Sequence, residues 1–470
     1  MLIPAASATL LVVNFLNDTS SKTRVDASKM LSNINFDLIC LGFFLKYSVF
    51  IMRVIIASKY SYYIQLFNNE IKVPMNTEDK LVRPLEGVVV IDSTHVLAGP
   101  YCTYQLALLG AKVIKIEPPT GDLVRPWGGT KEQIKQGLGM GFVSQNAGKR
   151  SFCVDISRPE GAELVLKLCE NADVFIENYR TDAISKHGLG YEDVKSVNPK
   201  IVYASLTAFG QNGPLGHRPG FDDVVQASSG FMADNRRESG PIRTGGPILD
   251  FASGMHATQS ILAGLMLRDK TGLPQRIDIA MQDVTMLLLN YTTALTSLNG
   301  GQPISIVQDI EGPMLGRFPA KEGFVMLAGY LPRHCCSIAA ALGLPRWTTT
   351  TLKDMQNNAA EMQSDVEKKL LEKTSDEWDV VFNKEGVVGA GVKELSEAFD
   401  TEQPKARQIT HPIDTAIGEI HVTTNGYMVN GDALNPDVQE AGDFSYSITG
   451  GADKDLFRVS DNGSLSFKDT

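Results

Sequence analysis

Short β-branched segments alternate with amphipathic segments between residues 86 and 280, and this alternation limits the possible folds more than any other feature. The first unit consists of the run GVVVID at 87–92, an amphipathic stretch at 101–109 and the run KVIKIE at 112–117. Continuous apolar strands of this kind are typical of parallel sheets that are buried on both faces. The pattern therefore predicts a doubly wound α/β domain. Its remaining predicted elements are a helix at 159–171 and strands at 151–156, 173–177, 201–207 and 275–280.

The turns between these segments lack the phosphate-binding motifs of the common nucleotide-binding folds. The turn after the first strand reads STHVLAGP, without the GxGxxG spacing of a dinucleotide-binding loop. The pattern GxxxxGK[ST] is absent from the whole sequence. These absences argue against a nicotinamide-dependent dehydrogenase. They leave open a nucleotide-like ligand that is held in another way.

The composition indicates a globular, acidic protein. The 470 residues carry a formal charge of −10, and 43 % of them are hydrophobic, which excludes intrinsic disorder. Nucleic-acid binding needs a basic surface, so we expect no nucleic-acid partner. The six cysteines include no CxxC pair and are expected to be reduced thiols, which favours a cytoplasmic location. No second ligand cluster accompanies the fragment His334-Cys335-Cys336, so no metal site is predicted.

Residues 1–84 precede the alternating pattern and are predicted to be an N-terminal extension, either poorly ordered or derived from a misread start. The most apolar stretch is 38–57, but Lys46 and Arg53 interrupt it. A helix that spans a membrane needs about 20 mostly uncharged residues. We therefore expect no membrane contact, with a single N-terminal anchor or a mitochondrial location as the alternatives.

One segment places a carboxylate at the predicted start of a long helix. Residues 245–270 read GGPILDFASGMHATQSILAGLMLRDK, and the apolar positions 251, 255, 262, 265 and 266 predict one buried helix face. Asp250 is expected at the N-cap of this helix. Two interpretations remain open. Asp250 either only caps the helix, or its carboxylate is kept ionised by the helix N-terminus and acts as a nucleophile.

Two further segments offer groups suited to an anionic ligand. Lys149 and Arg150 lie in the turn NAGKRS, where they either hold phosphate groups or are simply solvated. The segment ENYRTDAISKHG begins where a predicted strand ends, at the edge where α/β sheets bind ligands. It contains an amide, a flat apolar ring and a cation, which belong to Asn178, Tyr179 and Lys186.

Together these segments resemble the class III CoA-transferase family, which includes formyl-CoA transferase and carnitine CoA-transferase and is related to α-methylacyl-CoA racemase. The matching segments run from about residue 85 to about 330, and more thinly to about 435. They include LEGVVVIDSTHVLAGPYCTYQLALLGAKVIKIEPPTGDLVRPWG, NAGKRS, ADVFIENYRTDAISKHGLGYEDV, RPGFDDVVQASSG and KTGLPQRIDIAMQDV. The resemblance implies an enzyme that moves CoA from an acyl-CoA thioester to a carboxylic acid through an aspartyl-CoA thioester. CoA is then a substrate, and no metal or redox cofactor is implied.

The resemblance also assigns roles to particular residues. The catalytic aspartate of the family falls on Asp250. Acyl-CoA and carboxylic acids are the implied substrates, and the family's CoA-contacting positions fall on six residues of this chain. These are Val96, Lys149, Asn178, Tyr179, Lys186 and Met281.

Some positions depart from the family pattern and limit what it implies about specificity. Leu97 stands where formyl-CoA transferase has a glutamine near the reacting acyl group, and Pro118 and Pro119 replace an arginine pair. Phe221 stands where the racemases have a histidine, and phenylalanine cannot exchange a proton, which disfavours a racemase mechanism. A racemase-like isomerase and an inactive CoA-binding fragment remain the alternatives to a CoA-transferase.

The family fold also implies how the chain is divided. We expect a large Rossmann-like CoA-binding domain at 85–299, a smaller α/β domain at 300–400 and a segment at 401–436 that returns toward the large domain. In the family two such chains interlock as a homodimer. Residues 437–470 match no part of the family and instead resemble part of a cadherin-like repeat, which leaves the interlocking open.

Overall fold

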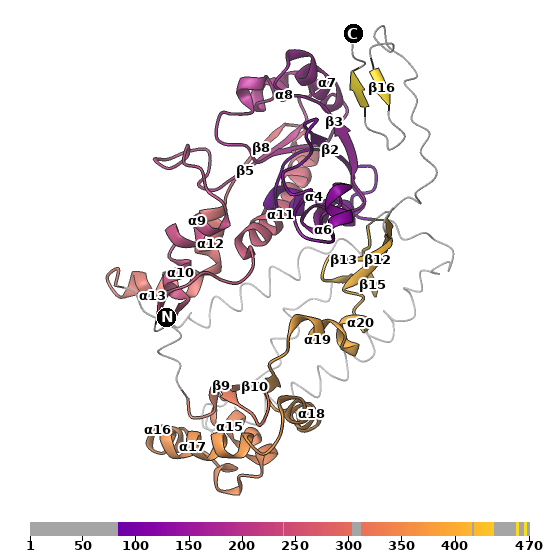
Figure 1. Cartoon of the computed structure of the whole chain (residues 1–470). Coiled ribbons are helices and arrows are strands. Elements are labelled where there is room, and N and C mark those ends of the chain that lie inside the picture. Colours follow the sequence, from indigo (N-terminus) through magenta and orange to yellow (C-terminus); the bar gives the residue numbers. More distant parts are fainter. Residues whose placement is uncertain are drawn as a thin grey trace, which may run out of the picture. The chain divides into compact units, whose positions relative to one another are not determined.

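Figure 1 shows the computed structural model of the chain. The structure describes residues 83–237, 239–302, 312–415 and 418–436, together with the backbone of 457–459 and 465–467. The predictions for residues 1–82, including the apolar stretch at 38–57, lie outside the described residues, and so does most of the tail. In the part of the chain that the structure describes, no helix is both long and apolar enough to cross a membrane.

Six parallel strands form the central sheet. They are β1 Val89–Ser93, β2 Lys112–Glu117, β3 Arg150–Cys153, β4 Val174–Glu177, β5 Val202–Thr207 and β8 Gln275–Ala280. The order across the sheet is β3-β2-β1-β4-β5-β8, so the sheet grows from β1 first in one direction and then in the other (Figure 1). All the strands predicted for this domain are confirmed, and two of them, 112–117 and 275–280, have the predicted bounds.

Successive residues of the central strands face opposite sides of this sheet, and helices cover both sides. Val90 and Ile176 pack in one core cluster with α4 and α11. Ile91 and Phe175 pack in a second cluster with α7 and α8. Burial on both faces explains why these strands are continuously apolar in the sequence. The covering helices are α4 Ala98–Leu108, α7 Pro159–Cys169, α8 Tyr191–Val197 and α11 Ile248–Thr271.

Helix α11 packs against α4 through small residues, and the apolar face predicted for it is wrong at two positions. Met255 and Met266 are 52 % and 61 % exposed, whereas Gly254 and Ala257 are buried. A Cβ atom at Gly254 would lie 2.7 Å from the carbonyl oxygen of Ala98, so only glycine allows the two helices to approach this closely. Two helices that pack closely need small side chains at their contact. A search for large apolar residues at helical spacing does not detect such a contact face.

Residues 314–387 enclose a second hydrophobic core, with the fully buried rings of Trp378 and Phe382 stacked inside it. Its antiparallel sheet has the order β11-β10-β9. A separate core is what a smaller domain requires, and the boundaries given above for the domains stay predictions. The elements are β9 Leu315–Pro319, β10 Phe324–Ala328, α15 Pro332–Leu342, α16 Leu352–Asn357, α17 Ala359–Leu370, α18 Ser375–Glu385 and β11 Gly389–Gly391.

The segment after residue 400 contacts α4. Ile413 and Val422 lie in one apolar cluster with Tyr104 and Leu108, and the Tyr104 hydroxyl donates a hydrogen bond to the carbonyl of Thr423. The elements here are α19 Leu395–Phe399, α20 Glu402–Ala406, the hairpin β12 Thr410–Thr415 with β13 Gly418–Thr423, and the pair β14 Met428–Val429 with β15 Asp432–Ala433. In the tail, β16 Phe457–Val459 and β17 Leu465–Phe467 pair antiparallel. The likeness of the tail to a cadherin repeat stays a prediction.

The remaining elements surround the carboxyl ends of the strands or connect the parts already described. They are α5 Lys131–Lys135, α6 Met140–Asn146, α9 Asp222–Ser228, α10 Phe231–Asp234, β6 Arg236–Arg237, β7 Gly240–Pro241, α12 Met281–Leu288 and α13 Asn290–Leu298.

Candidate active site

Two loops meet where the strand order reverses, between β1 and β4. Open α/β sheets bind ligands at such a point, outside the carboxyl ends of the strands. The His95 N–H donates to Oδ1 of Asn178 at 2.9 Å, and Nδ2 of Asn178 donates to the His95 carbonyl at 2.8 Å. The rings of His95 and Tyr179 meet edge to face with their centroids 4.9 Å apart. The loops after β1 and β4 therefore form one continuous surface, which we call the switch-point surface.

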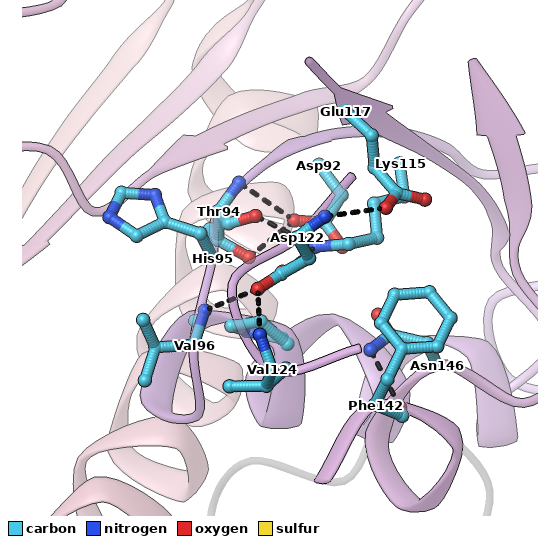
Figure 2. Close-up of polar contacts among 12 residues, drawn as sticks. Asp92, Thr94, His95, Val96, Lys115, Glu117, Asp122, Val124, Phe142 and Asn146 are labelled. Atoms are coloured by element: carbon cyan, nitrogen blue, oxygen red, sulfur yellow. Dashed lines mark hydrogen bonds and ion pairs between the residues drawn. The ribbon is translucent and has the colours of Figure 1, made fainter. Parts of the chain in front are cut away.

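The turn of residues 94–97, which leads from β1 into α4, rests on buried charged side chains (Figure 2). Oδ1 of Asp122 accepts hydrogen bonds from the N–H groups of Val96 at 3.3 Å and Val124 at 3.2 Å. Oδ2 of Asp122 pairs with Nζ of Lys115 at 3.0 Å. The same Nζ donates to the carbonyl of Thr94 at 2.8 Å. These contacts surround Val96, whose φ of 67° is left-handed and rare for a β-branched residue.

A second buried ion pair lies beneath this turn. Nζ of Lys149 contacts Asp92 at 3.1 Å, the Pro100 carbonyl at 2.8 Å, Thr103 Oγ1 at 2.7 Å and Asn146 Oδ1 at 2.8 Å. Burial lowers the pKa of Lys149 to about 8, although Asp92 attracts its charge. Burial also opposes ionisation of Asp92, but attraction to the lysines and hydrogen bonds from threonines outweigh it and lower its pKa to about 2. Both groups are therefore ionised at neutral pH, and the ammonium group holds protein oxygens rather than facing a ligand.

The structure thus separates the six residues that the resemblance assigned to CoA contact. Val96, Asn178 and Tyr179 come together at the switch-point surface. Lys186 is exposed on the loop that follows, whereas Met281 is only 4 % exposed, in the core at the start of α12. Their contacts with CoA stay predictions, and for Lys149 the geometry supports a structural role of the side chain.

Asp250 is the third residue of α11 and not its N-cap, which is Pro247. The residue that satisfies the first turn comes from α9. Oδ2 of Asp222 accepts hydrogen bonds from the N–H groups of Leu249 at 2.7 Å and Asp250 at 3.1 Å. The sequence gives no local sign of this cap, because Asp222 lies 27 residues before Leu249. Because Asp222 provides the cap, the carboxylate of Asp250 does not have the capping role that the sequence suggested.

The environment of Asp250 favours the protonated form of its side chain. The residue is only 8 % exposed. Burial, followed by repulsion from Asp222 and Asp223, raises its pKa to about 7. Burial and two like charges thus oppose the ionised form that one of the two interpretations of the sequence assumes for Asp250. Asp250 is ionised above about pH 7 and protonated below it.

The packing of α11 places Asp250 at the same end of α4 as the switch-point surface. Gly254 lies against Ala98, and Thr258, one turn further on, donates to the Cys102 carbonyl at 3.3 Å. The two helices therefore run in the same direction where they touch. Asp250 lies one turn before Gly254 on the same helix face. Asp250 and the turn of residues 94–97 therefore each lie about one turn before the contact between Gly254 and Ala98.

On the expectation that Asp250 is the nucleophile, replacing Asp222 by asparagine should shift the acid limb of kcat/KM to lower pH by about one unit. Removal of the buried negative charge lowers the pKa of Asp250, because Asp222 is the largest like-charge contribution to it. More of Asp250 is then ionised at a given pH below 7. A profile of kcat/KM between pH 5 and pH 9 measures the shift.

Asp223 provides the matched control for that profile. Its side chain is 61 % exposed and pairs with Arg243 at 2.6 Å, so Asp223→Asn should shift the limb much less. Glu177 also titrates in this range, since burial raises its pKa to about 7, but it is present in both variants. Lower activity of Asp222→Asn without a shift would show that Asp222 only holds the helix.

Comparison with known proteins gives this site its chemical class. The family model described as CoA-transferase family III matches residues 85–440, and the chain belongs to that family. It is accordingly an enzyme that transfers CoA between an acyl-CoA and a carboxylic acid. CoA thioesters are substrates of such enzymes.

Relatives and solved structures agree with this membership. The chain is 32 % identical over 355 residues to succinyl-CoA:glutarate CoA-transferase of Mus musculus, which covers 73 % of this chain and 79 % of that protein. It is 34 % identical over 338 residues to acetyl-CoA:oxalate CoA-transferase of Acetobacter aceti, covering 69 % and 85 %. A crystal structure of a CAIB/BAIF family protein from Brucella suis is similar with a TM-score of 0.66 and 28 % identity, covering 76 % of this chain and 95 % of that chain.

Proposed function

We propose that this enzyme transfers CoA through a covalent aspartyl-CoA thioester formed on Asp250. The observation that carries the proposal is the placement of one buried carboxylate at the start of α11, one turn before the glycine that contacts the start of α4. In the part of the chain that the structure describes, Asp222 accepts from the N–H groups of Leu249 and Asp250, so the Asp250 carboxylate is not needed to cap α11.

The proposed reaction needs only carboxylates and thioesters. The Asp250 carboxylate attacks the acyl carbonyl of the donor, and the C–S bond breaks to release CoA thiolate and a mixed anhydride. The thiolate then attacks the Asp250 carbonyl of the anhydride, which gives the aspartyl-CoA thioester and the free donor acid. An acceptor carboxylate attacks that thioester and repeats the two steps in reverse, so the acyl-CoA product leaves and Asp250 is regenerated.

The surroundings of Asp250 suit this chemistry. A mixed anhydride hydrolyses readily in open water, and Asp250 is buried enough to limit access. A carboxylate with a pKa near 7 is also a better nucleophile than one that is fully stabilised, because its negative charge is less favourably solvated. For the CoA moiety we propose contacts at the switch-point surface and beyond it, made by Val96, Tyr179, Lys186 and Met281.

The experiment that tests the proposal combines a substrate panel with mass spectrometry. Acetyl-CoA and succinyl-CoA serve as donors, and glutarate and oxalate serve as acceptors, because the relatives named above are described with these compounds. Monocarboxylic acids extend the panel of acceptors. We expect new acyl-CoA products and a CoA adduct on the peptide that contains Asp250. Transfer without any adduct on that peptide, even after rapid acid quenching, would contradict the covalent route.

We also propose that the enzyme is a homodimer, as the family resemblance implies. Large apolar side chains lie exposed along three consecutive helices, α11, α12 and α13, and a second copy of the chain would cover them. They include Met255, Met266, Leu267, Leu287 and Leu298.

Light scattering is expected to give twice the chain mass in dilute solution. Replacing Leu267 and Leu287 by glutamate should shift the protein to the monomer without unfolding it, since both side chains are about half exposed in a single chain. A wild-type protein that is active as a monomer would refute the assembly.

A further inference from the structure

Side chains hold both backbone polar groups of Thr94, both of His95 and the N–H of Val96 in the turn of residues 94–97. Oδ1 of Asp92 accepts from the Thr94 N–H at 3.0 Å, and Nζ of Lys115 donates to the Thr94 carbonyl at 2.8 Å. Asn178 accepts a hydrogen bond from the N–H of His95 and donates one to its carbonyl. The Val96 N–H donates to Asp122. This turn is therefore fixed from β1, from β2 and the loop that follows it, and from the loop after β4.

The amide of Asn178 has its carbonyl oxygen and one of its N–H groups committed to this turn. Its two hydrogen bonds, at 2.9 and 2.8 Å, join residues that are 83 positions apart in the sequence. One bond is made to the N–H of His95 and the other to the carbonyl of His95. An asparagine that used this oxygen to bind a ligand would first have to release the turn. The assignment of Asn178 to CoA contact therefore competes with a contact that the fold already makes.

The turn has to be held in place because valine disfavours the left-handed backbone conformation that Val96 adopts. A left-handed φ of 67° brings the Val96 Cβ close to its own carbonyl oxygen, so an unrestrained valine would leave this region. Such outliers persist only where the surroundings over-determine them, and they concentrate at functional sites. The side chain of Thr94 also fills the space over Gly99, where a Cβ would lie 2.4 Å from the Thr94 Cβ. Release of the turn would therefore disturb the first residues of α4.

We propose that Asn178 is a positioning residue for CoA transfer, which holds the His95–Val96 turn in its left-handed form where the turn enters α4. The inference rests on the proposed function, since it assumes that Asp250 reacts. The turn leads directly into Ala98, which contacts Gly254, and Asp250 lies one helical turn before Gly254. A turn that moves would change the shape of the site around the reacting carboxylate without removing any reacting group.

The test compares amide exchange, CoA binding and turnover in Asn178→Leu, which keeps the volume and removes both hydrogen bonds. The informative amide is that of Val96, because its own acceptor, Asp122, is untouched. We expect the Val96 amide to exchange at least about tenfold faster and kcat to fall at least about tenfold. The dissociation constant of CoA, measured by calorimetry, should change less than about threefold, because Val96 is only one of the four residues proposed to contact CoA. If Asn178→Leu does not fold, Asn178→Asp keeps the acceptor for the His95 N–H and should show smaller changes in the same direction.

Asn198 is the matched control, since it is a buried asparagine before β5, at the opposite end of the sheet. Its Nδ2 donates to the carbonyls of Cys169 at 2.9 Å and Ala172 at 2.7 Å. Asn198→Leu should lower stability but leave the Val96 exchange rate as in the wild type. An unchanged Val96 rate in Asn178→Leu overturns the proposal, and so does a tenfold weaker affinity for CoA with kcat unchanged. Because exchange is measured without substrate, it reports on the turn even if the wild type transfers no CoA and the proposed function fails.

Discussion

If Asp250 forms the proposed covalent bond, Asp250→Asn is expected to lose CoA transfer by at least about a thousandfold, since the variant lacks the attacking oxygen anion. Asparagine has nearly the same shape, and the Asp222 cap that holds the start of α11 does not depend on the Asp250 side chain. Steady-state transfer assays measure the loss. Mass spectrometry of the quenched reaction should show the CoA adduct in the wild type and none in the variant.

The same substitution should not destabilise the protein at alkaline pH. The pKa of Asp250 is raised from 3.8 to about 7 by burial, so the folded state binds a proton that the unfolded state has released between these values. Its contribution to stability therefore falls as the pH rises through this range and is most unfavourable above pH 7. At pH 8 we expect Asp250→Asn to unfold with a free energy higher by about 2–4 kcal/mol. A variant that transfers CoA at the wild-type rate, or that loses activity only because it unfolds, would refute the assignment.

Lys149→Met is expected to lower the free energy of unfolding by about 3–5 kcal/mol, because it leaves the carboxylate of Asp92 buried without its cation. The Asp92 side chain is fully buried and that of Lys149 is 2 % exposed. The variant also removes the donor that three further oxygens share. Urea denaturation followed by circular dichroism measures the change.

Two controls separate the loss of the buried pair from the loss of a charge. Lys167→Met removes a lysine whose pair with Glu163 is exposed, at 60 % and 67 %, and should change stability by less than about 0.5 kcal/mol. The double variant Asp92→Asn with Lys149→Met removes both charges and should recover part of the loss. A single variant as stable as the wild type would mean that Lys149 does not hold the loop before β3.

The strands of the sheet could be predicted because each has a recognisable local sequence pattern. Val90, Ile91 and Phe175 belong to apolar runs that only a sheet covered on both faces buries completely. The face of α11 could not be predicted in the same way. Gly254 is buried because α4 passes within contact of its backbone, and no residue near it in the sequence reports where α4 lies.

Individual candidate residues of the site could be named from the sequence, but the contacts that join them could not. The resemblance picked out Asp250, Asn178 and Tyr179, and the structure brings the last two together with His95. The cap from Asp222 and the buried Lys115–Asp122 pair joining β2 to its following loop were not found. Their partners are set by tertiary packing, and a single sequence carries no signal for which distant charge meets which backbone group. For the same reason the ammonium group of Lys149 was expected at a ligand and lies inside the protein.

The strand order also has a consequence for how the chain acquires its site during synthesis. The turn at His95 leaves the ribosome well before Asn178, and Asp250 follows later still, so every contact between them must wait for a long stretch of chain. Parallel strands joined over such separations form slowly, because the entropy of closing the loops is lost before the contacts are gained. Until β8 pairs with β5, the nascent sheet also ends in an unprotected apolar edge, and such edges associate readily with other chains. The Asp250 carboxylate and the strand that covers this edge are therefore both supplied by the same stretch of translation, from α11 to β8.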